Sequence, residues 1–230
     1  MTIKAILTDI EGTTTDINFV HKVLFPYARK HLPAFVRDHA ADEAVAREIA
    51  EVRATLNQPD ADVEAVIDQL LAWIDSDTKA TPLKTLQGLI WMKGYREQDF
   101  TGHVYPDAKA GLDRWKAQGL SLYVFSSGSV KAQQLIFGYS DFGDMCPLFS
   151  GYFDTKTGAK REAQAYVTIA SNIGLPANEI LFLSDITQEL DAAKAAGMQT
   201  CLLVRGEQPE NIQGHPQAAN FDEIERVNNA

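Results

Sequence analysis

The chain has 230 residues, 31 acidic and 21 basic, and a formal net charge of -10 at pH 7. Such a charge repels phosphate backbones and anionic lipid, which excludes a broad surface for nucleic acid or for a membrane. Two cysteines, Cys146 and Cys201, are too few for a disulfide framework or a cysteine-rich metal site. We expect both to be small core residues in a reducing compartment.

No apolar stretch approaches the roughly 20 residues that a membrane-spanning helix needs, and the apolar run near the N-terminus is too short for a signal peptide. We therefore expect a soluble, cytoplasmic protein. The length suits one large domain or one domain that carries an insertion.

The first predicted element is a buried parallel strand over residues 3–8, which ends abruptly at acidic, glycine and hydroxyl residues. It places Asp9 at its carboxyl end, with Glu11 and the conformationally permissive Gly12 close behind. Ligands of open α/β sheets bind outside the carboxyl ends of the strands, so Asp9 is a candidate nucleophile. Acid and glycine also end many strands simply because they form turns.

Residues 16–100 lack strand-like runs, and their apolar residues recur at helical spacing, which predicts an inserted helical domain. One helical face is expected to carry Tyr27, His31, Leu32 and Phe35, with Pro26 at the helix start and a kink at Pro33. Two further helices follow over about 45–56 and 63–74. A fourth has Thr81 as its N-cap, proline at its first position, and its end near Gly94.

Strands and helices alternate again from Tyr105. We predict strands at 120–125, 149–153, 180–184 and 200–204. Helices are expected at 106–118, at 130–137 and from about 190 to Gly197. A further helix is expected to begin at Lys160 and to carry Ala163, Tyr166, Val167 and Ala170 on one face. Residues 206–215 are predicted to be a polar loop, and 222–226 a short last helix.

This alternation predicts an α/β fold, a Rossmann-like doubly wound and mostly parallel sheet with an inserted helical cap. The core would comprise residues 1–15 and 101–230, and the cap residues 16–100. Three predicted strands end in polar clusters, at Asp9 and Glu11, at Ser126 and Ser127, and at Asp185. Right-handed crossovers would bring these ends to one edge of the sheet.

The chemistry of these clusters suits a phosphate ester and Mg²⁺. The carboxylates of Asp9 and Asp185 are hard oxygen ligands of the kind that Mg²⁺ prefers. The sequence has no cluster of cysteine and histidine of the kind that usually binds zinc. Residues 126–129 offer hydroxyls and backbone N–H groups ahead of a helix N-terminus, and Lys160 adds a positive charge for the same anion.

Each piece has a simpler interpretation. Residues 126–129 are adequate as a helix cap, Lys160 as a solvated charge at a helix end, and Asp185 as an N-cap followed by the helix-compatible acid Glu189. Their joint order along the chain is what favours a catalytic site.

That order resembles the haloacid dehalogenase (HAD) superfamily of phosphohydrolases over nearly the whole chain. Residues 9–13 match its first motif, Ser126 the second, Lys160 the third, and Asp185 with Glu189 the fourth. Most of the family's phosphatases have aspartate where this chain has Glu11. In this respect the chain resembles one branch of the family, whose enzymes also enolise their substrate. The resemblance to this branch includes Glu11, residues 126–129, 153–156 and 181–185, and the helical segment 79–91.

The resemblance implies Mg²⁺ held by the Asp9 side chain, the Glu11 main-chain carbonyl and Asp185, with phosphate held by Ser126, Ser127 and Lys160. Asp9 would be the nucleophile, and Glu11 the proton donor and acceptor. The expected partner is a small-molecule phosphate ester, bound by a monomer whose cap acts as a mobile lid. Two alternatives stay open: another HAD phosphatase acting on a sugar phosphate or phosphoserine, and a non-catalytic Mg²⁺ or phosphate-binding module.

Overall fold

The computed structural model describes residues 2–206 and 214–224. The chain divides into two compact units, one formed by residues 1–17 and 101–230 and the other by residues 18–100. Each unit has its own buried core. Within the described residues, no helix is both long enough and apolar enough to cross a membrane.

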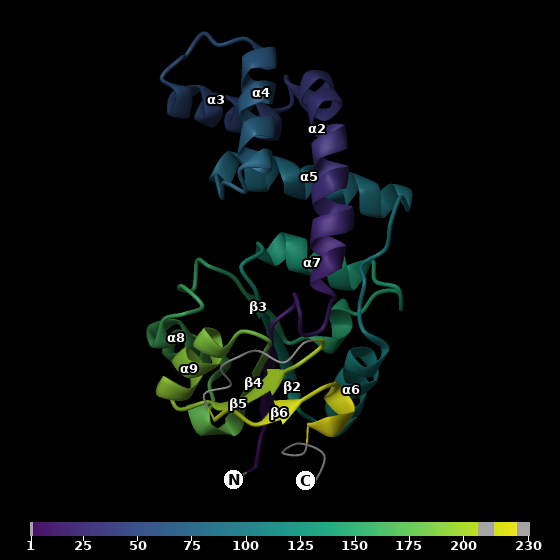
Figure 1. Ribbon diagram of the computed structural model, residues 1–230, viewed down its shortest axis with the longest axis vertical. Helices are drawn as coiled ribbons and strands as arrows, with labels where there is room; N and C mark the ends of the chain where they lie inside the picture. Colours follow the sequence, from purple (N-terminus) through teal and green to yellow (C-terminus); the bar gives the residue numbers. More distant parts are fainter. Residues whose placement is uncertain (1, 207–213, 225–230) are drawn as a thin grey trace. The chain divides into compact units, whose positions relative to one another are not determined.

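The first unit contains a six-stranded sheet in which every pair of neighbouring strands is parallel. Its strands are β1 (Ala5–Thr8), β2 (Ser121–Phe125), β3 (Gly151–Phe153), β4 (Ile180–Ser184), β5 (Gln199–Leu203) and β6 (Gln217–Ala218), in the spatial order β3-β2-β1-β4-β5-β6. This arrangement confirms the predicted α/β fold. Because β1 lies between β2 and β4, the carboxyl ends of these three strands are neighbours (Figure 1).

Helices cover both faces of this sheet. They are α6 (Pro106–Ala117), α7 (Val130–Gly138), α8 (Ala163–Ile173) and α9 (Thr187–Ala195), with short 3₁₀ turns η2 (Cys146–Leu148), η3 (Ala177–Glu179) and η4 (Phe221–Glu223). Alternate residues of a strand point to opposite faces, and Ala5 and Leu7 of β1 pack in one cluster with α8 and α9. Figure 1 shows α6 on the other side of the sheet. All four residues of β1 are buried, which explains why Ala5, Ile6 and Leu7 form a continuous apolar run before Thr8.

Several predicted details of this unit differ in the structure. Lys160 lies in a turn before α8 rather than at its first position, and Val167 is exposed because the buried face of α8 is formed by Ala165, Tyr166, Ile169 and Ala170. Cys146 is only partly buried, whereas Cys201 is in the core. The predicted last helix is the turn η4, and its expected end at Arg226 lies outside the described residues, as do positions 207–213 of the predicted polar loop.

The second unit contains helices joined by short turns, and no strand occurs among its described residues. Its elements are α1 (Ile17–Phe19, which begins at the unit boundary), the π-helical turn η1 (Val20–Leu24), α2 (Phe25–His39), α3 (Glu43–Leu56), α4 (Val63–Asp75) and α5 (Thr81–Glu97). Apolar side chains from α2 to α5 form one core.

The expected face of α2 is partly confirmed: Leu32 is fully buried, and Tyr27 and Phe35 pack against the same core while only partly buried. The other residues of α2 with no exposure are Ala28 and Val36. The helix continues through Pro33. In α5 the N-cap position is Ala80 rather than Thr81, and the helix passes Gly94 to end at Glu97. Gly94 is needed for packing, since a Cβ there would lie 2.6 Å from the Phe100 ring.

Candidate active site

The loop that follows β1 carries the candidate nucleophile and is closed by its own hydrogen bonds. The Ile10 carbonyl accepts the backbone N–H groups of Thr13, Thr14 and Thr15, and the Gly12 N–H donates to the Thr15 carbonyl at 2.8 Å. Gly12 has a φ of 70°, in the left-handed region that glycine adopts without strain. The loop therefore turns sharply and keeps Asp9 and Glu11 at the edge of the sheet.

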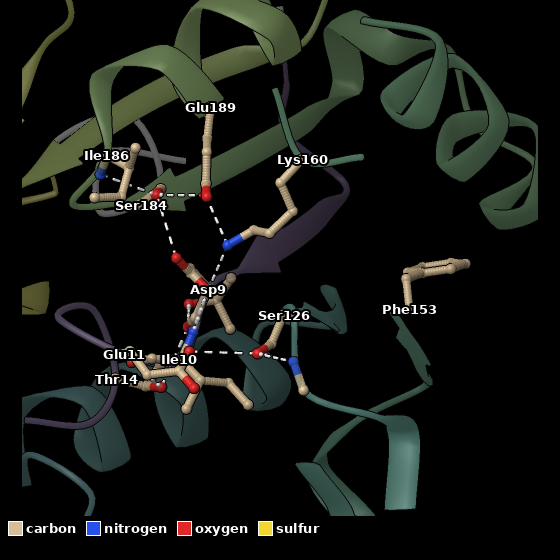
Figure 2. Close-up of polar contacts among 12 residues, drawn as sticks. Asp9, Ile10, Glu11, Thr14, Ser126, Phe153, Lys160, Ser184, Ile186 and Glu189 are labelled. Atoms are coloured by element: carbon tan, nitrogen blue, oxygen red, sulfur yellow. Dashed lines mark hydrogen bonds and ion pairs between the residues drawn. The ribbon is translucent and has the colours of Figure 1, made fainter. Parts of the chain in front are cut away.

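Asp9 lies at the centre of the site and is only 3% exposed (Figure 2). Its Oδ1 accepts the Ile10 N–H at 2.8 Å and lies 2.7 Å from the Lys160 Nζ. The Ser184 hydroxyl is 3.4 Å from Oδ2. Oδ1 is thus held by two short charge-assisted contacts, while Oδ2 has one long contact and is the less saturated oxygen.

Lys160 joins Asp9 to Glu189. Its Nζ lies 2.6 Å from Glu189 Oε2, and all three side chains are nearly buried. Burial alone would lower the pKa of the Lys160 ammonium, but the carboxylates of Asp9 and Glu189 outweigh it and raise that pKa, so the group stays charged. Burial and then the Asp9 charge raise the pKa of Glu189 to about 7.

Glu11 and Ser126 meet on the other side of Asp9. The Ser126 hydroxyl donates to Glu11 Oε2 at 3.3 Å and accepts the Gly128 N–H at 3.1 Å. Burial and the Asp9 charge raise the pKa of the Glu11 carboxyl. A raised pKa favours the protonated form, which is what a general acid requires.

Asp185 follows β4 and lies against the turn at Gly12. A Cβ on Gly12 would lie 2.1 Å from Asp185 Oδ2, so only glycine leaves room for this carboxylate. Burial first, and then the Asp9 charge, raise the pKa of Asp185 to about 7. The carboxylates of Asp9 and Asp185, both predicted as site residues, are therefore close enough for the charge of one to shift the pKa of the other.

The side chains of Gln133 and Asp154 hold the loop that follows β2 through hydrogen bonds to its backbone and to the start of α7. The Gln133 amide donates to the carbonyls of Gly128 and Phe153, both at 2.8 Å. Asp154 accepts the Val130 N–H, and Ser129 caps α7 by accepting the Ala132 N–H. Ser127 is exposed, and within the described residues no hydrogen bond or ion pair joins it to the other predicted site residues.

The donor set of this site fits a divalent cation with few protein ligands. Among the described residues, no group of three or more His, Cys, Asp or Glu side chains is arranged to hold a metal. Burial and then the Asp9 charge nevertheless raise the pKa values of Glu11, Asp185 and Glu189, and the Lys160 ammonium only partly offsets the effect of that charge, so a cation would relieve the repulsion among these carboxylates. Within the described chain, the Glu11 carbonyl accepts no hydrogen bond. Two carboxylates and one carbonyl suit Mg²⁺, which keeps several waters.

The structure adds residues to which the sequence had assigned no role in binding. Ser184, the last residue of β4, donates its hydroxyl toward Asp9 and Glu189 and accepts the Ile186 N–H. Glu189 matched the fourth motif, but its contact with Lys160 was not predicted. A serine directly before the acid at a strand end was the available signal for Ser184.

Comparison with known proteins agrees with this geometry. The haloacid dehalogenase-like hydrolase family matches residues 3–197. The chain therefore belongs to this family, which confirms the resemblance seen in the motifs.

Individual relatives narrow the comparison. The chain is 60% identical over 225 residues to "Enolase-phosphatase E1" of Azotobacter vinelandii, covering 98% of each chain. It is 58% identical to the protein of the same name from Serratia proteamaculans, covering 97% of each. The crystal structure of the UTR4 protein from Saccharomyces cerevisiae superposes with a TM-score of 0.81 at 35% identity, over 96% of this chain and 99% of that one. CbbY from Rhodobacter sphaeroides, at 16% identity and a TM-score of 0.62, shares the fold.

Proposed function

We propose that this protein is an enolase-phosphatase that acts on a small phosphate ester with a diketone next to the ester carbon. The observation that carries the proposal is the buried contact of Asp9 with Lys160 beside the Glu11–Ser126 pair, in a chain 60% identical to curated enolase-phosphatases. The proposed substrate is 2,3-diketo-5-methylthiopentyl 1-phosphate. Its products would be the acireductone 1,2-dihydroxy-3-keto-5-methylthiopentene and phosphate, in L-methionine salvage.

The phosphatase half-reaction follows from the side chains. The diketo phosphate first loses a proton from the ester carbon and gains one on the neighbouring carbonyl oxygen, which gives its enol phosphate. A carboxylate oxygen of Asp9 then attacks phosphorus, the bond from phosphorus to the ester oxygen of the enol breaks, and an aspartyl-phosphate forms. Glu11, whose raised pKa favours its acid form, gives a proton to the departing oxygen. Glu11 then accepts a proton from the water that attacks the aspartyl-phosphate, which releases phosphate and restores Asp9.

Lys160, Ser126 and Ser127 are the proposed phosphate-binding residues. The Lys160 ammonium keeps its charge beside Asp9 and would stabilise the negative phosphoryl oxygens as the bond changes. Ser126 has a hydroxyl at the site, and exposed Ser127 leaves its own hydroxyl and backbone available to a ligand.

Mg²⁺ is the proposed cofactor, held by the Asp9 carboxylate, the Glu11 carbonyl and Asp185. When bound, it would supply positive charge that offsets the negative phosphoryl group. Loss of this charge by chelation is expected to stop phosphate release.

The discriminating experiment compares turnover of the diketo phosphate with turnover of sugar phosphates, phosphoserine and an aryl phosphate. We expect the highest kcat/KM for the diketo phosphate, with an absorbing enol intermediate appearing before phosphate. A preference for a sugar phosphate or phosphoserine would point to another phosphatase of the same family. Absence of turnover with every ester, at a measured phosphate affinity, would leave only a binding module.

A further inference from the structure

A buried arginine outside the family motifs supports the loop that carries the nucleophile. The Arg205 side chain, 11% exposed, follows β5. Its Nε and Nη2 both donate to the Thr13 carbonyl, at 3.0 and 2.8 Å. Thr13 belongs to the turn between Asp9 and Thr15, so this guanidinium holds the backbone of the active-site loop directly.

The guanidinium is itself fixed on its other sides. Its Nη1 donates to Asp107 Oδ2 at 2.7 Å, and Asp107 lies in the first turn of α6. The carbon Cζ lies 4.2 Å from the centre of the Tyr105 ring and 5.3 Å from that of Phe221. The guanidinium is planar and rigid, so this fork of N–H donors, packed between two aromatic rings, loses little conformational freedom when it forms hydrogen bonds. It can therefore hold the Thr13 carbonyl in a fixed position.

The other loop carbonyls show why this support matters. Thr14 and Thr15 have backbone donors for their carbonyls, from Tyr105 and Gly12, whereas Thr13 has the side chain of Arg205. Movement of the Thr13 peptide would carry Gly12 with it, and Gly12 is packed within van der Waals distance of Asp185. It would also displace the Glu11 carboxyl from Ser126.

We propose that Arg205 is a positioning residue for phosphoryl transfer, which holds the Thr13 carbonyl so that Asp9 and Glu11 keep their reactive geometry. The inference rests on the proposed function. Arg205 touches no reacting atom, and its effect passes through the loop. Since misplacement of a reacting group by about 1 Å can cost ~10²-fold in rate, loss of the fork should lower kcat far more than it changes KM.

The test uses three variants of the full-length protein, assayed with an aryl phosphate. Arg205→Ala removes the fork, and Arg205→Lys keeps the positive charge beside Asp107 but cannot donate twice to one carbonyl while also reaching that carboxylate. Arg114→Ala is the matched control, because Arg114 also donates to a backbone carbonyl and a carboxylate, those of Phe221 and Asp222, yet contacts no loop residue among those described.

We expect kcat to fall roughly 10- to 100-fold in both Arg205 variants with KM nearly unchanged, and to stay within about twofold of wild type in Arg114→Ala. Guanidinium at tens of millimolar should restore part of the kcat of Arg205→Ala only. Circular dichroism identifies a variant that fails to fold, in which case Arg205→Lys decides.

Wild-type kcat in a folded Arg205→Lys, or an equal loss in Arg114→Ala, would overturn the proposal. So would a loss in Arg205→Ala that guanidinium does not relieve. Wild-type turnover of the aryl phosphate is measured in the same assay, so failure of the phosphatase chemistry appears as an inactive wild type. A preference for another ester appears in the substrate comparison above, and both outcomes are distinct from failure of the Arg205 proposal.

Discussion

The two oxygens of Asp9 have unequal surroundings, and this inequality determines what a substitution should do. Oδ1 accepts Lys160 and the Ile10 N–H, whereas Oδ2 has only the long contact with Ser184. A side chain of the same size can keep much of this network without being a nucleophile.

Asp9→Asn should therefore fold and lose phosphate release, because an amide cannot form an acyl-phosphate. Removal of a nucleophile commonly costs ~10⁴-fold or more in kcat. Phosphate release from an aryl phosphate measures the activity, and circular dichroism checks the fold. Near-normal turnover would remove Asp9 from this role.

Asp9→Glu separates the two steps of the proposed reaction. Enolisation needs a base and an electrophile, while phosphoryl transfer needs the Asp9 nucleophile at its exact position, so the added methylene should impair phosphate release more than enol formation. Enol absorbance and free phosphate are followed in one reaction, with Mg²⁺ binding measured separately. Parallel loss of both signals with intact Mg²⁺ binding would contradict the separation.

Asp185→Ala tests the proposed cation site. Removal of one of two carboxylates should raise the Mg²⁺ concentration needed for half-maximal rate by at least ~10-fold and lower the maximal rate. A calorimetric titration of the protein with Mg²⁺ alone provides a reading independent of activity. Gln188→Ala, an exposed neighbour in α9, is the control. An unchanged titration would exclude Asp185 as a ligand.

At the scale of elements, α5 contains two glycines whose surroundings are opposite. Apart from adjacent residues and the nearby backbone of the helix itself, no described atom lies within 4 Å of a Cβ built on Gly88. A Cβ on Gly94 would lie 2.6 Å from the Phe100 ring and 2.8 Å from Tyr27. The same substitution in one helix thus separates helix propensity from packing.

Gly88→Ala should stabilise the protein by about 0.5–1 kcal/mol, because alanine loses less conformational entropy in a helix. Gly94→Ala should destabilise it by about 1–3 kcal/mol, since the overpacking exceeds that gain. Urea unfolding followed by circular dichroism measures both. If both substitutions increased the free energy of unfolding by the same amount, the Tyr27 and Phe100 rings would have to move aside without cost.

Local sequence patterns predicted some elements of the fold correctly and failed for others. β1 and β4 were predictable because a continuous apolar run ends abruptly at an acid, and α3 because Val45, Ile49 and Val52 repeat at helical spacing. Gly94 was interpreted as a helix end, but its role is close packing with Phe100, which no local pattern records. β6 has two residues and hence no periodicity.

The candidate site divides in the same way. Asp9, Glu11, Ser126 and Asp185 were predictable because each follows a strand and matches a motif. Lys160 lies in the turn before α8 and was predictable from its motif. Arg205 was not, since its partner Thr13 is 192 positions away and its own neighbours carry no signal. The direct bonds of Lys160 to two carboxylates likewise depend on the folded arrangement.

For the whole molecule, separate cores predict separate stabilities. Trp73 and Trp91 belong to residues 18–100, while Trp115 is the only tryptophan in the rest of the chain. Tryptophan fluorescence can therefore report each unit once the other tryptophans are replaced by phenylalanine.

Leu32→Ala, at a position with no exposure in the helical core, should cost about 2–5 kcal/mol. We expect the unfolding midpoint reported by Trp73 and Trp91 to fall while that reported by Trp115 moves less. Leu190→Ala, buried in the other core, is the matched reverse case. Equal shifts at both reporters for both variants would mean that the chain unfolds as one cooperative unit.

The central place of β1 in the sheet has a consequence for biosynthesis. β1 is synthesised before both of its partner strands, since Ala5 pairs with Ser121 and Ile180, which the ribosome adds much later. Until then the backbone N–H and C=O groups of β1 have no partner strand, whereas the helices of residues 18–100 pack within a contiguous stretch and can fold during translation. During synthesis β1 therefore stays unpaired while residues 18–100 are added and fold, and the nucleophile that follows this strand acquires its supporting lysine and arginine only after that helical unit has been made.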